Sequence, residues 1–396
     1  MRPGTPGFIG ERLREAREAR AMTALALADL VGVTRAAVSQ YENGHQSPSP
    51  EIMRRLSKSL NVPVQRFIQA VRPIEYGTLF FRCMSSATKR ARLRANRRYG
   101  WLRESVSFVE HYVRLPEVRF PSFALPNNPA ELNDECIEEV ATGARRFWGL
   151  QDGPISNVAW LLENNGCIVS RFDLGAETLD AFSEWHLNSP RPFIVVSSGK
   201  QSACRSRFDA AHELGHLLLH RHIPESVFVQ HSSFGLIEKQ AHLFAAAFLL
   251  PAASFSKAFY APTLDSLVAM KGRWRVSIAA MIMRAAQLKL ISESQEKKLW
   301  MNLGRRKWRT REPLDDTIEQ EQPRFLKKCF DLLINKGVIS ACEVPYQLGL
   351  SASDIEQMTG IEAGTFESKS RQVELQGDTQ AEPDDDAHII RFPAML

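Results

Sequence analysis

The pentapeptide His212-Glu213-Leu214-Gly215-His216 constrains the fold of this chain more than any other feature. Two histidines four residues apart project from one side of an α-helix, because four residues nearly complete one turn. Both can therefore reach a single metal ion. Glu213 lies about 100° around the helix, where its carboxylate can contact a water on the metal without ligating the metal. The pattern predicts a helix over residues 207–220 with His212 and His216 as zinc ligands and Glu213 as general base.

A catalytic zinc needs a third protein ligand and one open position, and two downstream side chains are candidates. Glu238 lies 22 residues after His216, at the start of a predicted helix over 236–249. The small apolar residues of this helix would allow close packing on the first helix, although an acidic residue there could simply stabilise the helix N-terminus. His242 shares the face of Glu238 and could be the third ligand, hydrogen-bond a ligand, or donate to the transition state. His220 shares the face of the two ligand histidines, but a helix-terminal histidine is its simpler interpretation.

Residues 8–70 show the pattern of a compact all-helical unit. Short helices are predicted over residues 24–31 and 34–42, and Gly32 between them allows a tight turn. Two helices joined in this way are the signature of a helix-turn-helix, whose second helix enters the major groove of DNA. A protein-docking module of the same architecture is the alternative. The side chains that the second helix would present to DNA are Thr34, Arg35, Ala36, Ser39 and Gln40.

The N-terminal quarter is strongly basic, although the whole chain carries a net charge of only +5. Residues 1–103 hold 19 Lys and Arg against 7 Asp and Glu, so the other 293 residues carry a net charge of −7. A basic front end on a mildly acidic body favours a nucleic-acid partner, here double-stranded DNA. Residues 71–125 are interpreted as a basic linker, in which the cluster 89–98 either contacts phosphates or forms a solvated helix face.

The rest of the chain predicts a small α+β domain over residues 126–255, with strands over 167–172 and 192–196. Residues 256–375 are expected to be helical. The tail over 376–396 is acidic and contains proline, which predicts disorder. The predicted fold class is therefore multidomain and mainly α, with an all-α helix-turn-helix domain, an α+β domain with a small sheet, and a helical C-terminal region.

Cysteine usage and hydropathy bear on location. The six cysteines are scattered without a CxxC pair, which argues against a disulfide framework and against a cysteine-based zinc site. The N-terminus has no apolar segment of the signal-peptide kind, and no apolar run reaches the roughly 18 residues needed to span a bilayer. We therefore expect a cytoplasmic protein without a membrane partner. The sequence leaves the oligomeric state open, and a dimer is compatible with it.

Two segments resemble known families, and together they cover roughly half of the chain. Residues 8–68 resemble Xre/Cro-type repressor domains, on the matching runs 27–34 and 38–44. A second and more specific resemblance, over residues 125–255, is to the ImmA/IrrE metallopeptidase family. Its matching pieces are Gly153-Pro154-Ile155, Phe182-Ser183, residues 205–220 and residues 238–251.

The second resemblance implies a zincin-like peptidase domain with zinc as its cofactor. It implies an endopeptidase that cleaves a transcriptional repressor protein, in mobile-element or stress-response regulation. The same resemblance assigns zinc ligation to His212, His216 and Glu238, and the general-base role to Glu213. The alternative is a DNA-binding transcriptional regulator, or an antitoxin-like protein, whose peptidase domain is non-catalytic.

Two positions depart from the family patterns. His242 stands where family members usually have a small polar residue, so the metal shell of this chain is expected to differ there. Ala24-Leu25 opens the second helix, where repressor domains often have a polar residue such as Gln that contacts phosphate. This second departure predicts weak DNA affinity.

Overall fold

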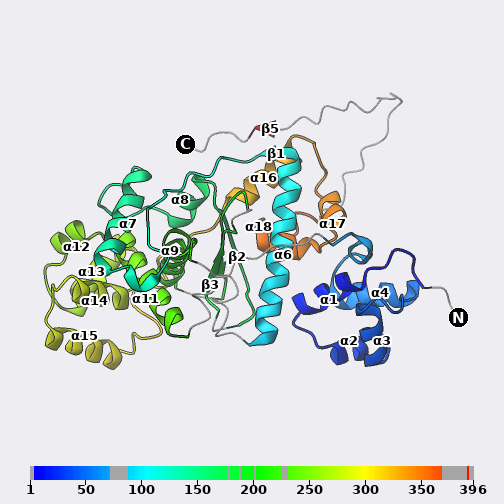
Figure 1. The fold of residues 1–396 in the computed structure, drawn as a ribbon, viewed down its shortest axis with the longest axis horizontal. Helices are drawn as coiled ribbons and strands as arrows, with labels where there is room; N and C mark the ends of the chain where they lie inside the picture. The colour runs from blue at the N-terminus through cyan, green and yellow to red at the C-terminus, as the bar shows by residue number, and fades with distance from the viewer. Residues whose placement is uncertain are drawn as a thin grey trace.

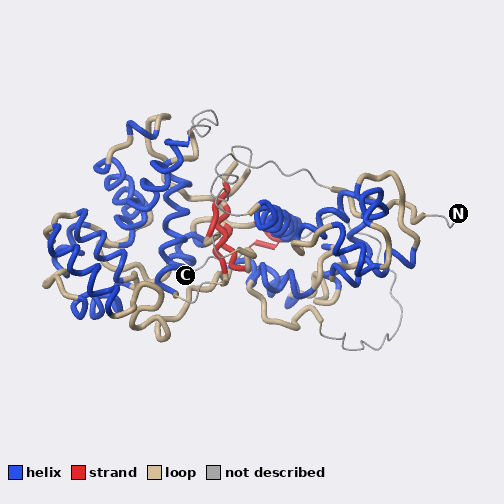
Figure 2. Tube along the Cα trace, turned by 90° about the horizontal axis from the view of Figure 1, so that it is seen from below, coloured by secondary structure: helices blue, strands red, loops and turns tan. Residues whose placement is uncertain are grey.

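In the computed structural model of the chain, the described residues are 4–71, 88–176, 179–186, 189–199, 202–223, 231–367 and 390–391. They form a mainly helical chain with a three-stranded sheet near its centre (Figures 1 and 2). The first helices lie at one end of the molecule, and helices from the middle of the chain lie at the other end, beyond the sheet (Figure 1). The predicted fold class is confirmed.

The N-terminal unit consists of short helices, and capping side chains set the starts of α2 and α3. The hydroxyl oxygens of Thr23 and Thr34 each accept a hydrogen bond of 3.1 Å from a backbone N–H three residues later. Gly32 joins the two capped helices with φ of +73°, a left-handed conformation that favours glycine. The elements are α1 (Gly10–Ala19), α2 (Ala24–Val31), α3 (Arg35–Glu42), α4 (Pro50–Leu60) and the 3-10 helix η1 (Val64–Ile68).

The structure differs from the predicted linker over residues 71–125. Residues 89–112 form the long helix α6 (Lys89–Tyr112), and one side of it is buried against the N-terminal unit and the sheet. Tyr99 of α6 is fully buried, and its ring packs edge-on against Phe182 and Phe193 of the sheet. The arginines of this segment indicate a solvated stretch, but buried aromatic and small side chains on more than one face make α6 a core helix.

The sheet has the strand order β2-β4-β3, in which β2 and β4 are parallel and β3 is antiparallel to β4. The strands are β2 (Ile168–Phe172), β3 (Ala181–Glu184) and β4 (Phe193–Ser197). Strands β2 and β4 agree with the predictions over 167–172 and 192–196. The sequence did not predict β3, because four residues with polar Ser183 and Glu184 at one end give too short a pattern.

The two faces of the sheet belong to two different hydrophobic cores. Ile168 and Val195 lie in the core shared with α6 and the N-terminal unit, whereas their neighbours Val169 and Ile194 lie in the core behind the sheet. Alternation along a strand produces this division, because successive side chains point to opposite faces. The sheet is therefore the layer that joins the half of the molecule with the N-terminal unit to the half that carries the pentapeptide.

The core behind the sheet is helical. Its main helices are α9 (Ala203–Leu219) and α11 (His231–Leu249). They agree with the predicted helices over 207–220 and 236–249, except that His220 is the C-cap of α9. The other helices on this side are α7 (Asp134–Phe147), α8 (Val158–Asn164), α12 (Ala252–Ala258), α13 (Leu264–Trp274), α14 (Ile278–Gln287) and α15 (Glu293–Arg305), and the short 3-10 helix η2 (Pro129–Glu131) precedes α7.

The predicted helical region over residues 256–375 is helical, but it divides between the two cores. Helices α12 to α15 pack behind the sheet, whereas the later helices pack with α6 and the N-terminal unit. These later helices are α16 (Phe325–Asn335), α17 (Glu343–Leu348) and α18 (Ala352–Thr359). The chain therefore crosses back over the sheet after α15. Dividing the sequence into consecutive domains, with residues 256–375 as one region, could not show this crossing.

Helix α18 connects the N-terminal unit to the sheet. The guanidinium of Arg20 pairs with the carboxylate of Asp354, and Ser170 Oγ of β2 donates to the carbonyl oxygen of Met358 at 2.6 Å. Asp354 and Ser170 are both buried. The N-terminal unit is thus fixed to the rest of the protein by specific polar contacts as well as by apolar packing.

The acidic tail predicted over 376–396 lies outside the described residues except for Ile390–Arg391. These two residues form β5, which pairs in parallel with β1 (Val113–Arg114). Within the described ranges, no single helix is long and apolar enough to cross a membrane, although Phe234–Leu249 and Ala252–Ala258 together, bent by 64°, meet that criterion by length and composition.

Candidate metal centre and nucleic-acid interface

The candidate metal centre lies where α9 and α11 pack against each other. A Cβ atom at Gly215 of α9 would lie 3.0 Å from the ring of Phe244 and 3.3 Å from the Cα atom of Ala241. A side chain at this position would therefore require Phe244 or the backbone of α11 to move, so glycine permits the close approach of the two helices. Their close approach brings Glu238, near the start of α11, next to the histidines of α9.

Ring nitrogens of two histidines and both carboxylate oxygens of one glutamate converge at this point. The Nε2 atoms of His212 and His216 lie 3.0 Å apart. The two carboxylate oxygens of Glu238 lie 3.3 Å from His212 Nε2 and 3.4 Å from His216 Nε2. His216 is fully buried, and the side chains of His212 and Glu238 are 11% and 30% exposed. The fold therefore brings the two predicted histidines and the predicted glutamate together in a group that is partly open to solvent.

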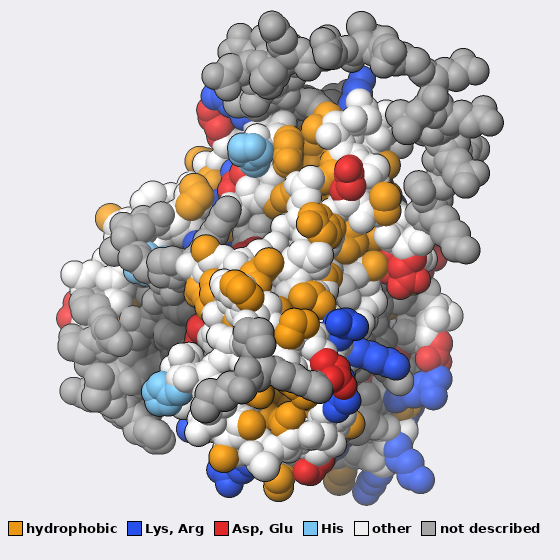
Figure 3. Space-filling model, turned by 90° about the vertical axis from the view of Figure 1, so that its right-hand side faces the viewer, with side chains coloured by type: hydrophobic (Ala, Val, Ile, Leu, Met, Phe, Trp, Pro, Cys, Tyr) orange, Lys and Arg blue, Asp and Glu red, His pale blue; other side chains and the backbone are white. Residues whose placement is uncertain are grey.

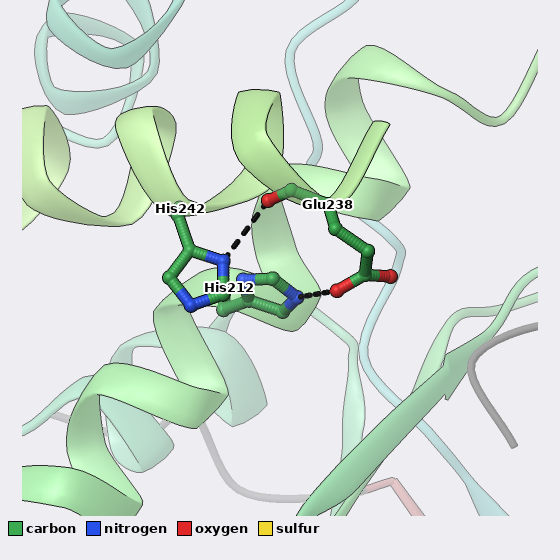
Figure 4. A group of neighbouring side chains, drawn as sticks. All are labelled: His212, Glu238 and His242. Carbon is green, nitrogen blue, oxygen red and sulfur yellow. Dashed lines mark hydrogen bonds and ion pairs between the residues drawn. The ribbon is translucent and has the colours of Figure 1, made fainter. Parts of the chain in front are cut away.

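His242 lies next to His212 and Glu238 and forms with them a second group that could hold a metal ion. The rings of His242 and His212 pack edge to face with centroids 4.4 Å apart, and His242 Nδ1 lies 2.9 Å from the carbonyl oxygen of Glu238 (Figure 4). One nitrogen of His242, one nitrogen of His212 and one oxygen of Glu238 lie within 4.8 Å of one another. His242 is exposed and could approach a metal held by the other three residues.

The donor set fits a zinc ion. Ligand atoms placed tetrahedrally at about 2.0–2.1 Å from zinc are separated by about 3.3–3.4 Å. The two histidine nitrogens lie 3.0 Å apart, and each lies 3.3–3.4 Å from a different carboxylate oxygen of Glu238, which is close to this value. Two imidazoles and one carboxylate are also the ligand types that a catalytic zinc site uses.

Glu213 and a serine of β3 lie beside the donor atoms. Ser183 Oγ donates a hydrogen bond of 2.6 Å to Glu213 Oε2, and both residues are buried. Glu213, His212 and Glu238 line a pocket of about 240 Å³, together with residues at the start of β3 and the aromatic side chains Phe208 and Phe234. Sequence reasoning missed the role of Ser183, because its partner is 30 residues away and β3 was not predicted.

On the side away from the pocket, His216 contacts the first of a row of buried, hydrogen-bonded polar side chains. His216 Nδ1 lies 3.1 Å from His220 Nδ1, and His220 Nε2 lies 3.2 Å from Gln240 Oε1. Gln240 Nε2 donates to the carbonyl oxygens of Pro129 and Leu132 at 2.6 and 3.0 Å. His220 is therefore not a further member of the donor group, because its ring faces the back of His216.

The charges of the metal-free site are coupled. Burial lowers the pKa of His212, but the hydrogen bond to Glu238 and the charge of Glu213 raise it by more, so the pKa lies above its usual value. Burial raises the pKa of Glu238, but its close contacts with His212 and His216 outweigh burial and hold the pKa well below the usual range. Burial and the charge of His212 lower the pKa of His242. A proton on His212 is therefore the competitor that a metal must displace.

The predicted DNA-contacting residues share an exposed face of α3. Thr34, Arg35, Ala36, Ser39 and Gln40 are all exposed, whereas Val38 on the opposite side is fully buried. Thr34 Oγ1 caps α3, so its side chain also has a structural role. Leu25 of α2 is 55% exposed, so an apolar side chain lies where repressor domains often have a polar residue that contacts phosphate. Figure 3 faces this end of the molecule, and Lys and Arg side chains gather toward its lower edge.

The basic cluster over residues 89–98 is divided between two roles. Arg97 pairs with Glu11 and Glu18 of α1, and Arg94 pairs with Asp173. Arg98 is buried and donates to the carbonyl oxygen of Asp173 and to Gln357. The exposed members of the cluster are Lys89, Arg90 and Arg92. Much of the basic excess therefore joins parts of the protein and is not available to phosphates.

Comparisons with known proteins agree with both halves of this description. Residues 13–67 match the family model of the helix-turn-helix, and residues 162–286 match that of the IrrE N-terminal-like domain, a metallopeptidase-type domain. An uncharacterized HTH-type transcriptional regulator of Bacillus subtilis (strain 168), RghRB, is 36% identical over 68 residues, which are 17% of this chain and 49% of that protein. The chain thus covers about half the length of this curated relative. These matches confirm the two resemblances, and the chain combines a DNA-binding helix-turn-helix with a region similar to the IrrE N-terminal-like domain.

Proposed function

We propose that this protein is a zinc-dependent endopeptidase in which His212, His216 and Glu238 hold the metal and Glu213 is the general base. The observation that carries the proposal is the approach of the two Nε2 atoms to within 3.0 Å, each of them 3.3–3.4 Å from one carboxylate oxygen of Glu238. His212 and Glu238 line one pocket with the carboxylate of Glu213. Distances of this kind suit one tetrahedral ion. His242, beside Glu238, is proposed as a group that contacts the substrate or a ligand and not as the third ligand.

The proposed reaction is hydrolysis of a peptide bond. When bound, zinc supplies Lewis-acid polarisation of the substrate carbonyl and lowers the pKa of water toward neutrality. Glu213 accepts a proton from the attacking water as its oxygen adds to the carbonyl carbon, and then delivers that proton to the leaving amine nitrogen. Ser183 holds one carboxylate oxygen of Glu213 in place, so the other oxygen carries the proton.

We propose further that the substrate is a transcriptional repressor protein, cleaved while both proteins are bound near the same DNA site. Two features support this pairing: the exposed face of α3 for DNA, and the pocket at α9 for a protein chain. A DNA-bound peptidase meets a neighbouring DNA-bound repressor at a raised effective concentration, without any additional contact between them.

The chemical part of the proposal is tested with Glu213→Gln in the full chain. We expect this variant to retain zinc and to lose hydrolysis of the repressor, because the amide cannot accept the proton. Zinc content is measured on the purified protein, and cleavage is followed by mass spectrometry. Cleavage by Glu213→Gln at the wild-type rate would exclude the proposed general base.

The DNA part is tested with exposed residues of α3 and not by removing residues 8–70, since these pack against α6 in the shared core. Cleavage of the repressor is compared with and without operator DNA in the wild type and in the triple variant Arg35→Ala, Ser39→Ala, Gln40→Ala. We expect DNA to accelerate the wild type only. Equal acceleration, or none in either protein, would contradict the tethering.

A regulator with a non-catalytic peptidase domain is the second candidate, or an antitoxin-like protein of that kind. The similarity of the N-terminal residues to a transcriptional regulator favours it. The Glu213→Gln variant separates the two candidates in a reporter assay: full complementation of the wild type by this variant would favour the non-catalytic function.

A further inference from the structure

The buried chain His216–His220–Gln240 ends on atoms whose hydrogen-bonding roles are fixed. Gln240 contacts the carbonyl oxygens of Pro129, in η2, and Leu132, and carbonyl oxygens only accept hydrogen bonds. The side-chain atom of Gln240 at 2.6 and 3.0 Å from them must therefore be the amide nitrogen. The reverse orientation of the amide would place three oxygen atoms in repulsive contact inside the protein.

This orientation determines the hydrogens along the rest of the chain. Gln240 Oε1 is an acceptor, so the nitrogen that faces it, His220 Nε2, must carry a hydrogen. A neutral imidazole has one N–H and one acceptor nitrogen, so His220 Nδ1 is the acceptor. His216 Nδ1 faces that acceptor at 3.1 Å and must donate to it. His216 Nε2 then has no hydrogen, and its lone pair points toward His212 and Glu238.

We propose that Gln240 and His220 are positioning residues that select the tautomer of His216 whose Nε2 lone pair faces the metal position. Neither residue touches the substrate or the donor atoms of the site. All three side chains are essentially fully buried, so water does not replace their contacts. The inference rests on the proposed metal site, but it makes a statement about His216 that holds without metal.

The arrangement links the metal position to a distant part of the fold. His220 is the C-cap residue of α9, and Gln240 belongs to α11. The carbonyl groups that Gln240 contacts lie more than 100 residues before it in the sequence. Metal-bound histidines generally donate their other ring N–H to a fixed acceptor, which orients the ring and increases its basicity. Here that acceptor is a second histidine, whose own tautomer must be set by a further residue.

The direct test is ¹⁵N nuclear magnetic resonance of the metal-free full chain labelled at histidine. We expect the His216 ring, assigned by comparison with His216→Gln, to carry its hydrogen on Nδ1. A hydrogen on Nε2 of His216 would overturn the proposal. This result does not depend on zinc, so failure of the wild type to bind zinc would contradict the proposed function and leave this inference standing.

The second test compares two substitutions of His220 by their zinc affinity. A glutamine at this position can accept from His216 Nδ1 and donate to Gln240, whereas a leucine of similar size can do neither. We expect His220→Leu to weaken zinc binding about 10–100-fold and His220→Gln to retain most of the affinity. Circular dichroism of both metal-free variants checks that they fold.

Equal zinc affinities of folded His220→Leu and the wild type would overturn the proposal, as would equal losses in both variants. If His220→Leu does not fold, zinc affinity is measured on Gln240→Leu, which removes the hydrogen-bond partner of His220. The magnetic resonance experiment on the unmodified protein still decides the tautomer of His216.

Discussion

Helices α3 and α9 carry the two candidate functional surfaces, and they differ in how much of each is fixed by the protein. On α3, only Val38 and Glu42 are buried, and the candidate DNA contacts project into solvent. On α9, both ends of His216 and one oxygen of Glu213 are held by other side chains. Neighbouring side chains therefore orient the groups of the candidate metal centre, whereas most candidate DNA contacts on α3 are exposed to solvent. Substitutions should accordingly act on different properties in the two regions.

The largest expected effect concerns Glu238, the proposed third zinc ligand beside α9. Glu238→Ala should weaken zinc binding by more than the roughly 100-fold that is typical for losing a group behind a ligand. His242→Ala on the same helix is the matched control and should have a smaller effect, because its Nδ1 contacts the carbonyl oxygen of Glu238. Chelator competition measures both affinities. A larger loss in His242→Ala than in Glu238→Ala would make His242 the third ligand.

The next prediction concerns the exposed side. Arg35→Ala should weaken DNA binding by about 1–3 kcal/mol, as expected for an arginine that contacts bases or phosphates, and leave zinc affinity unchanged. Arg54→Ala is the control, since Arg54 is an exposed arginine of α4 outside the candidate surface. Fluorescence anisotropy at several salt concentrations measures the affinity and the number of phosphate contacts. Equal losses in the two variants would indicate a general charge effect and not contact by α3.

Much of this contrast could be predicted from the sequence, because it depends on local spacing. The positions of His212, Glu213 and His216 follow from one helical turn, and the start of α3 follows from Thr34 acting as a cap. These inferences need no knowledge of distant residues.

The remaining features depend on contacts between distant segments. Ser183 meets Glu213 through a strand of four residues, and Gln240 meets Pro129 across 111 residues. Arg20 pairs with Asp354, 334 residues later, so nothing in the local pattern indicated that α18 joins the N-terminal unit to the sheet. For the same reason, the arginines of α6 suggested a linker: their acidic partners are on α1 and near β2.

A third prediction concerns the pH dependence of zinc affinity at the candidate metal centre. Because the pKa of His212 is raised, this residue keeps its proton to a higher pH than an ordinary histidine. Zinc requires the neutral ring, so zinc affinity should fall about tenfold per pH unit once the pH drops below that raised pKa. Competition titrations between about pH 5 and 8 measure this dependence. A constant affinity between pH 7 and about 6 would contradict a two-histidine site.

In the metal-free protein the same pair should affect stability. The raised pKa of His212 means that its contribution is complete below the ordinary value of 6.5 and is lost as the pH rises through the folded value. The lowered pKa of Glu238 means that its contribution is present above 4.5 and is lost as the pH falls through the folded value. The pair therefore stabilises the metal-free protein most between these two ordinary values. Thermal unfolding of wild type and Glu238→Gln across this range measures the difference.

The smallest expected effect concerns the orientation of the general base. Ser183→Ala removes one hydrogen bond to Glu213, and a bond to a charged group contributes roughly 1.5 kcal/mol, so kcat should fall about tenfold. Zinc affinity and KM should be nearly unchanged, because Ser183 contacts neither the donor atoms nor the bound chain in the proposed mechanism. Ser170→Ala is the matched control: Ser170 is also buried in the sheet, but it donates to α18.

The two serine variants separate orientation from stability. Ser170→Ala should lower the free energy of unfolding without changing kcat, because its partner is the backbone of Met358 and not a side chain of the pocket. If Ser183→Ala leaves kcat at the wild-type value, the hydrogen bond from Ser183 is not required to orient Glu213 for catalysis. The contrast between a fixed metal centre and an adaptable DNA surface would then be limited to the metal ligands. If both variants lose kcat equally, the sheet transmits packing defects to Glu213, and the hydrogen bond from Ser183 has no separate catalytic role.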